Sequence, residues 1–404
     1  MTLSEALDWL YSTQFFGIKL GLENTRALIA AAQIDVSGAK VIHVAGTNGK
    51  GSTCAMIEAI ARESGLKTGL FTSPHLVDFA ERIRVNGEMI PDDELLEGIC
   101  FVRKLAESVE QAPTFFELAL ILALRYFMKQ GVELIILETG MGGRLDATNA
   151  VAKDVAVLTP IGLDHQQYLG DTLAAVAAEK AAIIAPSRVV VTAAQEPQAM
   201  QVITETATAK DALLILAEPH ERIPQLALAG PHQRQNAAVA MEAFSAIHRL
   251  PSQVKLAHAL GNVDWPGRFE QVKSPAIILD GAHNAHAARV LVETWKEKFG
   301  DERAAIVFAA SADKQIQEML PLFDAIVGEW HLVPCSSPRI LPVGEMAELL
   351  AGCVTTPIYQ HESLEAGLRA AEQSELRALA AGSLFLLGDI KAHIKHQKKR
   401  QTVQ

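Results

Sequence analysis

The sequence predicts an α/β protein with two domains: a P-loop-type, mostly parallel sheet domain followed by a smaller Rossmann-like α/β domain. Three observations lead to this prediction. Short apolar runs alternate with helix-prone segments, which is typical of parallel sheets. The chain has 404 residues, more than one ordinary core holds. The pattern also restarts after residues 262–268, so we expect domains at 1–267 and 268–404.

The first domain is expected to alternate strands and helices from its start. The expected strands are 40–45, 68–72, 81–87, 132–137, 155–159, 189–192 and 213–216. The expected helices are 2–10, 53–63, 91–109, 115–130, 171–184, a helix after 197, 231–248 and 252–260. Thr114 stands three residues before Glu117, which is capping-box spacing, and acidic residues follow Pro91 in the first turn of its helix.

The second domain repeats the alternation on a smaller scale. Its expected strands are 276–279, 305–309, 325–333, 356–359 and 383–387. Its expected helices run from 285 to about 299, from 343 and from 363. This order again predicts a parallel sheet.

Composition excludes several classes of protein. A net charge of −11 argues against a nucleic-acid partner. The four cysteines form no C-x-x-C pair, which favours a reducing compartment over a disulfide framework or a zinc site. The N-terminus resembles no secretion signal, and the longest apolar stretch, 118–128, is too short to span a bilayer. We therefore expect a cytoplasmic protein, without a membrane partner and monomeric.

The segment Gly46–Ser52 predicts a phosphate-binding loop. An apolar strand leads into the glycine-rich turn, and a helix-prone run follows at once. Backbone N–H groups at such a helix start point at an anion, and Lys50 can reach the outer phosphates. The common motif places Ser or Thr directly after the lysine, whereas here Gly51 intervenes before Ser52. The chain is therefore predicted to use ATP.

Polar residues follow other predicted strands. Ser73, Glu138 and His165 should share a sheet edge with the phosphate loop, because parallel strands end at the same edge. Their oxygen and imidazole groups suit Mg²⁺ or Mn²⁺, although each alone is as well explained as structural. Asp280 and His283 follow a strand of the second domain, which can close over that edge. Residues 11–22 are either a lid packed on the core or a flap over a flat aromatic ligand.

Taken together, the ordered blocks resemble the folylpolyglutamate synthase/dihydrofolate synthase family of the Mur ligase superfamily. The resemblance covers nearly the whole chain and rests on residues 46–52, 72–76, 81–87, 142–149, 164–165, 168–170, 179–180, 266–268 and 280–284. It implies that ATP phosphorylates a carboxylate of dihydropteroate or of a tetrahydrofolate that carries glutamate. The amine of L-glutamate then attacks the acyl phosphate, and an amide forms. Phosphorylation is needed because an amine does not displace oxide from a carboxylate.

The resemblance also assigns residues to roles. ATP is expected to contact Asn48, Gly49, Lys50, Gly51, Ser52, Asn236, Arg268 and Asp280. Magnesium is expected at Ser73, Glu138 and His165, and the pterin substrate at Thr114, Leu145, Asp146 and Ala147. Catalytic roles fall to Lys50, Lys180 and His283, and Lys180 matches the lysine that is carbamylated in the superfamily. A lysine must lose its proton to react with CO₂, and burial favours that loss.

Two departures leave alternatives open. Ala182 stands where the family usually has glycine, with little expected effect, and residues 383–388 differ from a histidine-bearing version in some bifunctional members. The enzyme could therefore act on dihydropteroate, on glutamylated folates, or on both. A cell-wall precursor ligase and a nucleotide-dependent switch without ligase chemistry are the remaining hypotheses.

Overall fold

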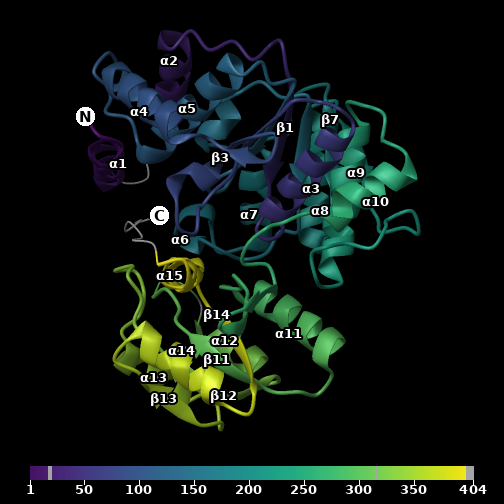
Figure 1. Ribbon diagram of the computed structural model, residues 1–404. Coiled ribbons are helices and arrows are strands. Elements are labelled where there is room, and N and C mark those ends of the chain that lie inside the picture. Colours follow the sequence, from purple (N-terminus) through teal and green to yellow (C-terminus); the bar gives the residue numbers. More distant parts are fainter. Residues whose placement is uncertain (17–20, 313, 315, 397–404) are drawn as a thin grey trace.

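The computed structural model describes residues 1–16, 21–312, 314 and 316–396. Two sheets, each covered by helices, form two lobes along one chain (Figure 1). We call the part with the larger sheet, from α1 to α10, the first lobe, and the part from β9 to α15 the second lobe. The predicted mixed α/β fold is confirmed. The boundary between 267 and 268 stays a prediction. Within the described residues, no helix is both long and apolar enough to cross a membrane.

The first lobe is built on an eight-stranded sheet. In spatial order its strands are β4 (Glu88–Met89), β3 (Ile83–Val85), β2 (Thr68–Phe71), β5 (Leu134–Glu138), β1 (Lys40–Ala45), β6 (Val155–Leu158), β7 (Val189–Thr192) and β8 (Leu213–Leu216). From β2 to β8 neighbouring strands pair in parallel, while β3 and β4 add an antiparallel edge. The register pairs Val44 with Glu138, so the phosphate loop and this carboxylate leave the sheet at the same edge.

Helices cover both faces of this sheet. Its helices are α1 (Leu3–Ser12), α2 (Glu23–Ala31), α3 (Lys50–Glu63), α4 (Asp92–Ala106), α5 (Phe115–Lys129), α6 (Gln166–Leu169), α7 (Leu173–Ala181), α8 (Pro197–Ala209), α9 (His232–Ser245) and α10 (Gln253–Gly261), with short 3-10 turns η1 (Thr13–Phe16), η2 (Phe79–Arg82) and η3 (Ala147–Ala150). One face packs on α3, α9 and α10 through Ile42 and Val44. The other packs on α4 and α5, and on α7 and α8. Because both faces of the sheet are covered, every residue of β1 after Lys40 is buried, including His43.

The second lobe repeats the design on a six-stranded sheet. In spatial order its strands are β13 (Ile358–Gln360), β12 (Val327–Leu332), β11 (Ala304–Phe308), β14 (Arg377–Ala381), β10 (Ala276–Leu279) and the antiparallel β9 (Glu270–Lys273). Its helices are α11 (Ala285–Phe299), α12 (Ile316–Phe323), α13 (Val343–Ala351), α14 (Leu364–Gln373) and α15 (Leu384–Ile394). The helices α11 to α13 cover one face, and α14 and α15 the other. Leu76 of the first lobe joins the α15 side, so the lobes share apolar contact.

One predicted element is wrong. Residues 383–387 were expected to form a strand, but they begin helix α15, and the strand β14 precedes them. Gly382 turns the chain with φ of +104°, and the Ser383 hydroxyl accepts a hydrogen bond from the Phe385 N–H as a helix cap. A short apolar run fits a buried helix as well as a strand, so its pattern alone does not separate the two.

Other differences concern boundaries and small elements. Helix α3 begins at Lys50 rather than at residue 53, so the lysine itself lies in the first turn. Helix α7 begins after its Thr172 cap, and the segment 81–87 is a 3-10 turn followed by a short strand. The helices α2 and α12 and the strand β9 were not anticipated. The capping box of Thr114 and Glu117 is confirmed.

Candidate active site between the two lobes

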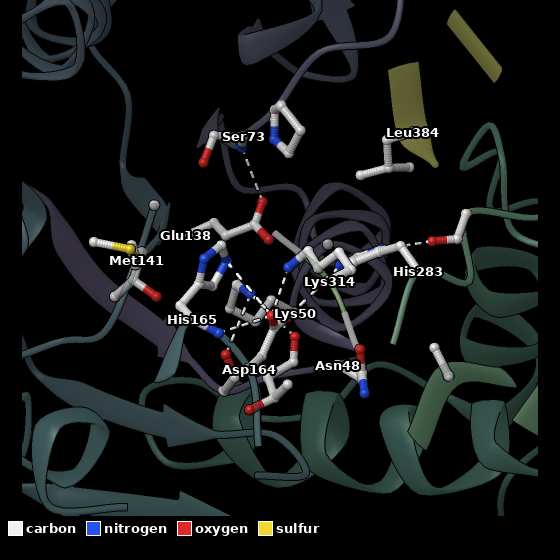
Figure 2. A pocket seen from close by; sticks show the side chains of 18 of the residues that line it. Asn48, Lys50, Ser73, Glu138, Met141, Asp164, His165, His283, Lys314 and Leu384 are labelled. Atoms are coloured by element: carbon white, nitrogen blue, oxygen red, sulfur yellow. Dashed lines mark hydrogen bonds and ion pairs between the residues drawn. The ribbon is translucent and has the colours of Figure 1, made fainter. Parts of the chain in front are cut away.

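A cavity of about 1090 Å³ lies between the lobes, and every site residue named from the sequence lines it. The first lobe contributes the phosphate loop and the ends of β2, β5 and β6. The second lobe contributes the turn after β10, the loop after β11 and the start of α15. Figure 2 shows how side chains from both lobes converge, with Lys50 and Asp164 near the centre. The predicted sheet edge is therefore also the floor of an interlobe cleft.

The glycines of the phosphate loop are required by close packing. Gly49 has φ of +83°, and a Cβ there would lie 2.6 Å from Oδ1 of Asn236. A Cβ on Gly46 would lie 1.9 Å from Oγ1 of Thr159, and one on Gly51 would lie 2.7 Å from Nε1 of Trp265. These approaches leave the loop backbone exposed at the N-terminus of α3, where N–H groups attract an anion.

Two lysines meet at one carbonyl of this loop. Lys50 donates to the carbonyl oxygens of Gly46 at 3.2 Å and Thr47 at 3.3 Å. Lys180, which is buried on α7, donates to the same Gly46 oxygen at 2.9 Å. Burial and the charge of Lys50 lower the pKa of Lys180 to about 7. Near neutral pH this amine therefore exists partly without its proton, as a nucleophile.

Glu138, Ser73 and His165 lie on the same side of the cleft. The Ser73 N–H donates to Oε2 of Glu138 at 3.0 Å (Figure 2). Burial raises the pKa of the Glu138 carboxyl, against the opposing charge of Lys50. Burial also lowers the pKa of His165 to about 4, so its imidazole is neutral. A buried carboxylate, which a nearby positive charge would stabilise, and a neutral imidazole can both act as ligands of a divalent cation.

The predicted metal site nevertheless offers few protein ligands. Among the described residues, no group of three or more His, Cys, Asp or Glu side chains could hold a metal ion. The predicted set has two such side chains and a serine hydroxyl, so phosphate oxygens or water would have to complete it. This fits Mg²⁺, which usually keeps several waters and binds few carboxylates beside substrate phosphates.

The predicted substrate wall is stiffened by hydrogen bonds. Thr114 donates to Glu117 from both its N–H and its hydroxyl. Asp146 accepts from the N–H groups of Gly140 at 2.8 Å and Met141 at 2.9 Å, and it also accepts from the next loop segment. Both Asp146 oxygens are thus engaged with the loop, and burial raises the pKa of its carboxyl. Leu145 and Ala147 flank it along the cavity.

The junction and the second lobe supply the opposite wall. The Asp280 oxygens accept from the N–H groups of Phe269 and Ala282, both at 2.9 Å, and burial raises the pKa of this carboxyl. Arg268 donates to the Gly267 carbonyl at 3.1 Å. His283 donates through Nδ1 to the Gly281 carbonyl at 2.7 Å, which leaves Nε2 facing the cleft.

Asn236 and Asn48 differ from what a direct phosphate contact requires. Asn236 is buried and donates to Oε1 of Gln233 at 2.9 Å, with its oxygen beside Gly49. The Asn48 side chain turns to the second lobe, where it pairs with Asn284 and lies 2.8 Å from Nδ1 of His286. The Asn48 N–H donates to the Pro160 carbonyl at 3.2 Å, and its side-chain amide belongs to the lobe contact.

Sequence reasoning missed two residues at the centre of the cleft, Asp164 and Lys314. Their side chains form an ion pair across the lobes at 2.5 Å. Asp164 was read as part of a motif without a role, and Lys314 follows strand β11 as other site residues follow theirs. The position of Lys314 at a strand end was the available signal.

The segment 11–22 is only partly described, because residues 17–20 lie outside the described residues. Tyr11, in the last turn of helix α1, stacks on Phe115 with ring centroids 5.5 Å apart, and its hydroxyl lies 3.1 Å from Nε2 of His75. Gln14 and Gly21 line the cavity. These contacts put both ends of the segment at the substrate wall.

Residues 44–223 match the Mur ligase middle domain, and residues 267–387 match the Mur ligase, glutamate ligase domain. The chain is 33% identical over 426 residues to the dihydrofolate synthase/folylpolyglutamate synthase of Bacillus subtilis, covering 97% of this chain and 99% of that protein. It is also 33% identical over 365 residues to the Escherichia coli protein of the same name, covering 86% and 85%.

Solved structures give the same result. The structure is similar to E. coli FolC in complex with DHPP and ADP, with a TM-score of 0.87, 30% identity, and 97% and 98% of the two chains covered. It is also similar to a Yersinia pestis bifunctional folylpolyglutamate synthase/dihydrofolate synthase complexed with AMPPNP and Mn ion, with a TM-score of 0.86, 30% identity, and 98% of each chain covered.

Proposed function

The chain belongs to the dihydrofolate synthase/folylpolyglutamate synthase family of Mur ligases, and from this membership we propose how its cleft joins glutamate to a pterin-linked acid. It is an ATP-dependent ligase of folate metabolism. One observation carries the proposal for the residues: a phosphate loop, a buried carboxylate and a buried lysine with lowered pKa line one cavity between two lobes. A nucleotide-dependent switch has no need of that combination.

The first step transfers the terminal phosphoryl group of ATP to the substrate carboxylate. Both reactants are anions, so the cleft must neutralise charge as they approach. Lys50 and the N–H groups of residues 49–52 serve this purpose on the ATP side. Arg268, at the junction, supports the nucleotide from the other side, and Asn236 packs against Gly49 of the loop. A divalent cation held by Ser73, Glu138 and His165 would supply further positive charge at the phosphates.

The second step is attack of the glutamate amine on the acyl phosphate. The carbon–nitrogen bond forms as phosphate leaves, and the amine must lose a proton. His283 is placed for this stage, because its Nε2 faces the cleft while Nδ1 is fixed on the Gly281 carbonyl. The pterin-linked acid lies along Thr114 and residues 145–147, whose loop Asp146 holds in place.

Lys180 is proposed to act as a carbamate. Its amine shares the Gly46 oxygen with Lys50, so two cations at this point repel each other. Reaction of the neutral amine with CO₂ forms a nitrogen–carbon bond and releases one proton. The product is a carboxylate, which turns the repulsion with Lys50 into attraction and adds an oxygen ligand to the cleft.

The substrate range, the monomeric state and the cytoplasmic location stay proposals. The decisive measurement is ADP release with glutamate and either dihydropteroate or a glutamylated tetrahydrofolate. Turnover with both acids supports a bifunctional enzyme, and turnover with the folate alone supports a monofunctional folylpolyglutamate synthase. Protein that binds ATP but turns over with neither acid would contradict the proposed substrates.

A further inference from the structure

The lobes meet at a buried carboxylate, Asp164, in the loop after β6. Three groups of the second lobe surround it. Nζ of Lys314 lies 2.5 Å from Oδ1, and Nε2 of His283 lies 3.7 Å from Oδ2 (Figure 2). Nδ2 of Asn284 lies 3.2 Å from Oδ2. The side chains of Asp164 and Lys314 are only 9% and 10% exposed. This ion pair is therefore far from an ordinary surface pair.

Asn284 ties the same carboxylate to the phosphate loop. Its Nδ2 group donates to Asp164 and to Oδ1 of Asn48, at 3.2 Å in both cases. Its oxygen accepts from Nδ2 of Asn48 at 3.3 Å and from the Ala287 N–H at 2.9 Å, which caps helix α11. Every donor and acceptor capacity of this buried amide is used, so its position depends on both lobes together.

Charge balance makes the contact specific to the closed arrangement. Within its own lobe Asp164 accepts a hydrogen bond from the His165 N–H at 2.9 Å. The ammonium of Lys314 and the amide of Asn284, which come from the second lobe, compensate the buried charge from across the cleft. If either partner of the ion pair is lost, the other is left as an unpaired charge in the closed cleft, which is costly, so the intact pair supports closure.

We infer that Asp164 is the docking point on which the second lobe closes, and that Lys314 and Asn284 are positioning residues that keep His283 over the phosphate loop. Neither residue is required to touch ATP for this role. The kinetic consequence rests on the proposed ligase function: closure sets the apparent affinity for the amine substrate, which must lie between His283 and the acyl phosphate. ATP sits on the phosphate loop and the junction and depends less on closure.

Small-angle X-ray scattering of the full chain without ligand tests closure independently of activity. Lys314→Gln should give a larger radius of gyration than the unmodified protein, because the carboxylate then favours water over the closed cleft. The matched control is Lys391→Gln, which removes an ion pair of the same length, 2.5 Å from Glu270, within the second lobe. That control should leave the radius unchanged. An unchanged radius for Lys314→Gln in a folded protein would overturn the inference.

Kinetics test the positioning role. Lys314→Gln should raise the KM for glutamate about tenfold or more and the KM for ATP less than about threefold, since a charged hydrogen bond is worth at least a factor of ten. Lys314→Arg, which keeps the charge, should recover part of the loss. Equal rises in both KM values would contradict the inference.

A double-mutant cycle separates closure from direct contact with substrate. If Lys314 acts through Asp164, Lys314→Gln should add little once Asp164→Asn is present. If Lys314 binds the glutamate carboxylate itself, the same change costs as much in the Asp164→Asn background, and the inference fails. Absence of turnover with every pterin acid would count against the proposed function alone, because the scattering result would still decide closure.

Discussion

The two lobes contribute to the cleft in different ways. In the first lobe, burial raises the pKa of Glu138 and lowers that of Lys180, the residues proposed above for metal binding and for the carbamate. In the second lobe, Asn284 and Lys314 are turned toward the first lobe, and the Asp280 oxygens are used by their own backbone. The first wall therefore carries the phosphate loop and a lysine of lowered pKa, while the second wall carries the contacts between the lobes together with His283.

The largest expected effect is the loss of the reactive amine on the first wall. Lys180→Ala should lower kcat by about 10²–10³-fold, the range for removing a charged group that stabilises a transition state. ATP binding should persist, because Lys50 and the loop backbone remain. Turnover in the two-substrate assay and ATP titration by calorimetry measure the two quantities. Full activity without Lys180 would contradict the carbamate proposal, and the proposed difference between the two walls of the cleft would then lose its main support.

Substitutions at two glycines distinguish the effect of close packing in the phosphate loop from the effect of a positive φ. Gly49→Ala should weaken ATP binding at least about tenfold, because a left-handed residue then carries a Cβ that meets Asn236. Gly65 has a similar φ of +87° with open space around it. Gly65→Ala should therefore cost only about 1 kcal/mol of stability, with ATP affinity unchanged. If both variants bind ATP equally well, close packing does not shape the loop.

The pH dependence of activation sharpens the role of Lys180. Its pKa is lowered from the ordinary 10.5 to about 7, so the neutral amine is present above pH 7 and disappears as the pH falls through that value. At fixed dissolved CO₂, recovery of activity in CO₂-depleted enzyme should therefore slow about tenfold per pH unit below 7. Stopped assays after pre-incubation measure the rate, and Lys180→Met should show no CO₂-dependent recovery. A recovery rate independent of pH would exclude this amine as the reacting group.

The smallest effect compares two capping boxes. Glu117 is buried and accepts hydrogen bonds from Asn24, Thr25 and Thr114, whereas Glu5 caps α1 with Thr2 at the surface. Glu117→Gln should lower the free energy of unfolding by about 1–3 kcal/mol, because an amide cannot accept all these bonds. Glu5→Gln should leave the urea midpoint unchanged within error. Equal midpoints for both variants would show that the buried cap does not stiffen the substrate wall.

Much of the fold follows from local pattern, and the exceptions have physical causes. Strand ends could be located because buried parallel strands are short apolar runs bounded by turns, and those ends placed Ser73, Glu138 and His165 on one cavity. The prediction of a strand at residues 383–387 was wrong because a buried helix and a buried strand share an apolar pattern. The adjacent strand, 377–381, is rich in alanine and has weak strand propensity.

The cleft itself depends on contacts that no local pattern contains. Asp164 and Lys314 are 150 residues apart in the chain, and only the packing of the two lobes makes them an ion pair. The turn of the Asn48 side chain toward Asn284 has the same origin. The motif therefore predicts a strand, a glycine-rich turn and a helix that the structure contains, but it does not indicate that the Asn48 side chain contacts the other lobe.

Gly46, which has no side chain, accepts hydrogen bonds from the amines of Lys50 and Lys180 through its carbonyl oxygen. A Cβ there would overlap Thr159, and the Thr47 N–H of the same peptide plane donates to the Pro160 carbonyl at 3.0 Å, so steric exclusion and a hydrogen bond together set that plane. The amines of Lys50 and Lys180 are both oriented by the carbonyl oxygen in that plane. A single methyl group at this position would tilt the oxygen and displace both amines together. The orientation of Lys50 and Lys180 therefore depends on the absence of a side chain at Gly46.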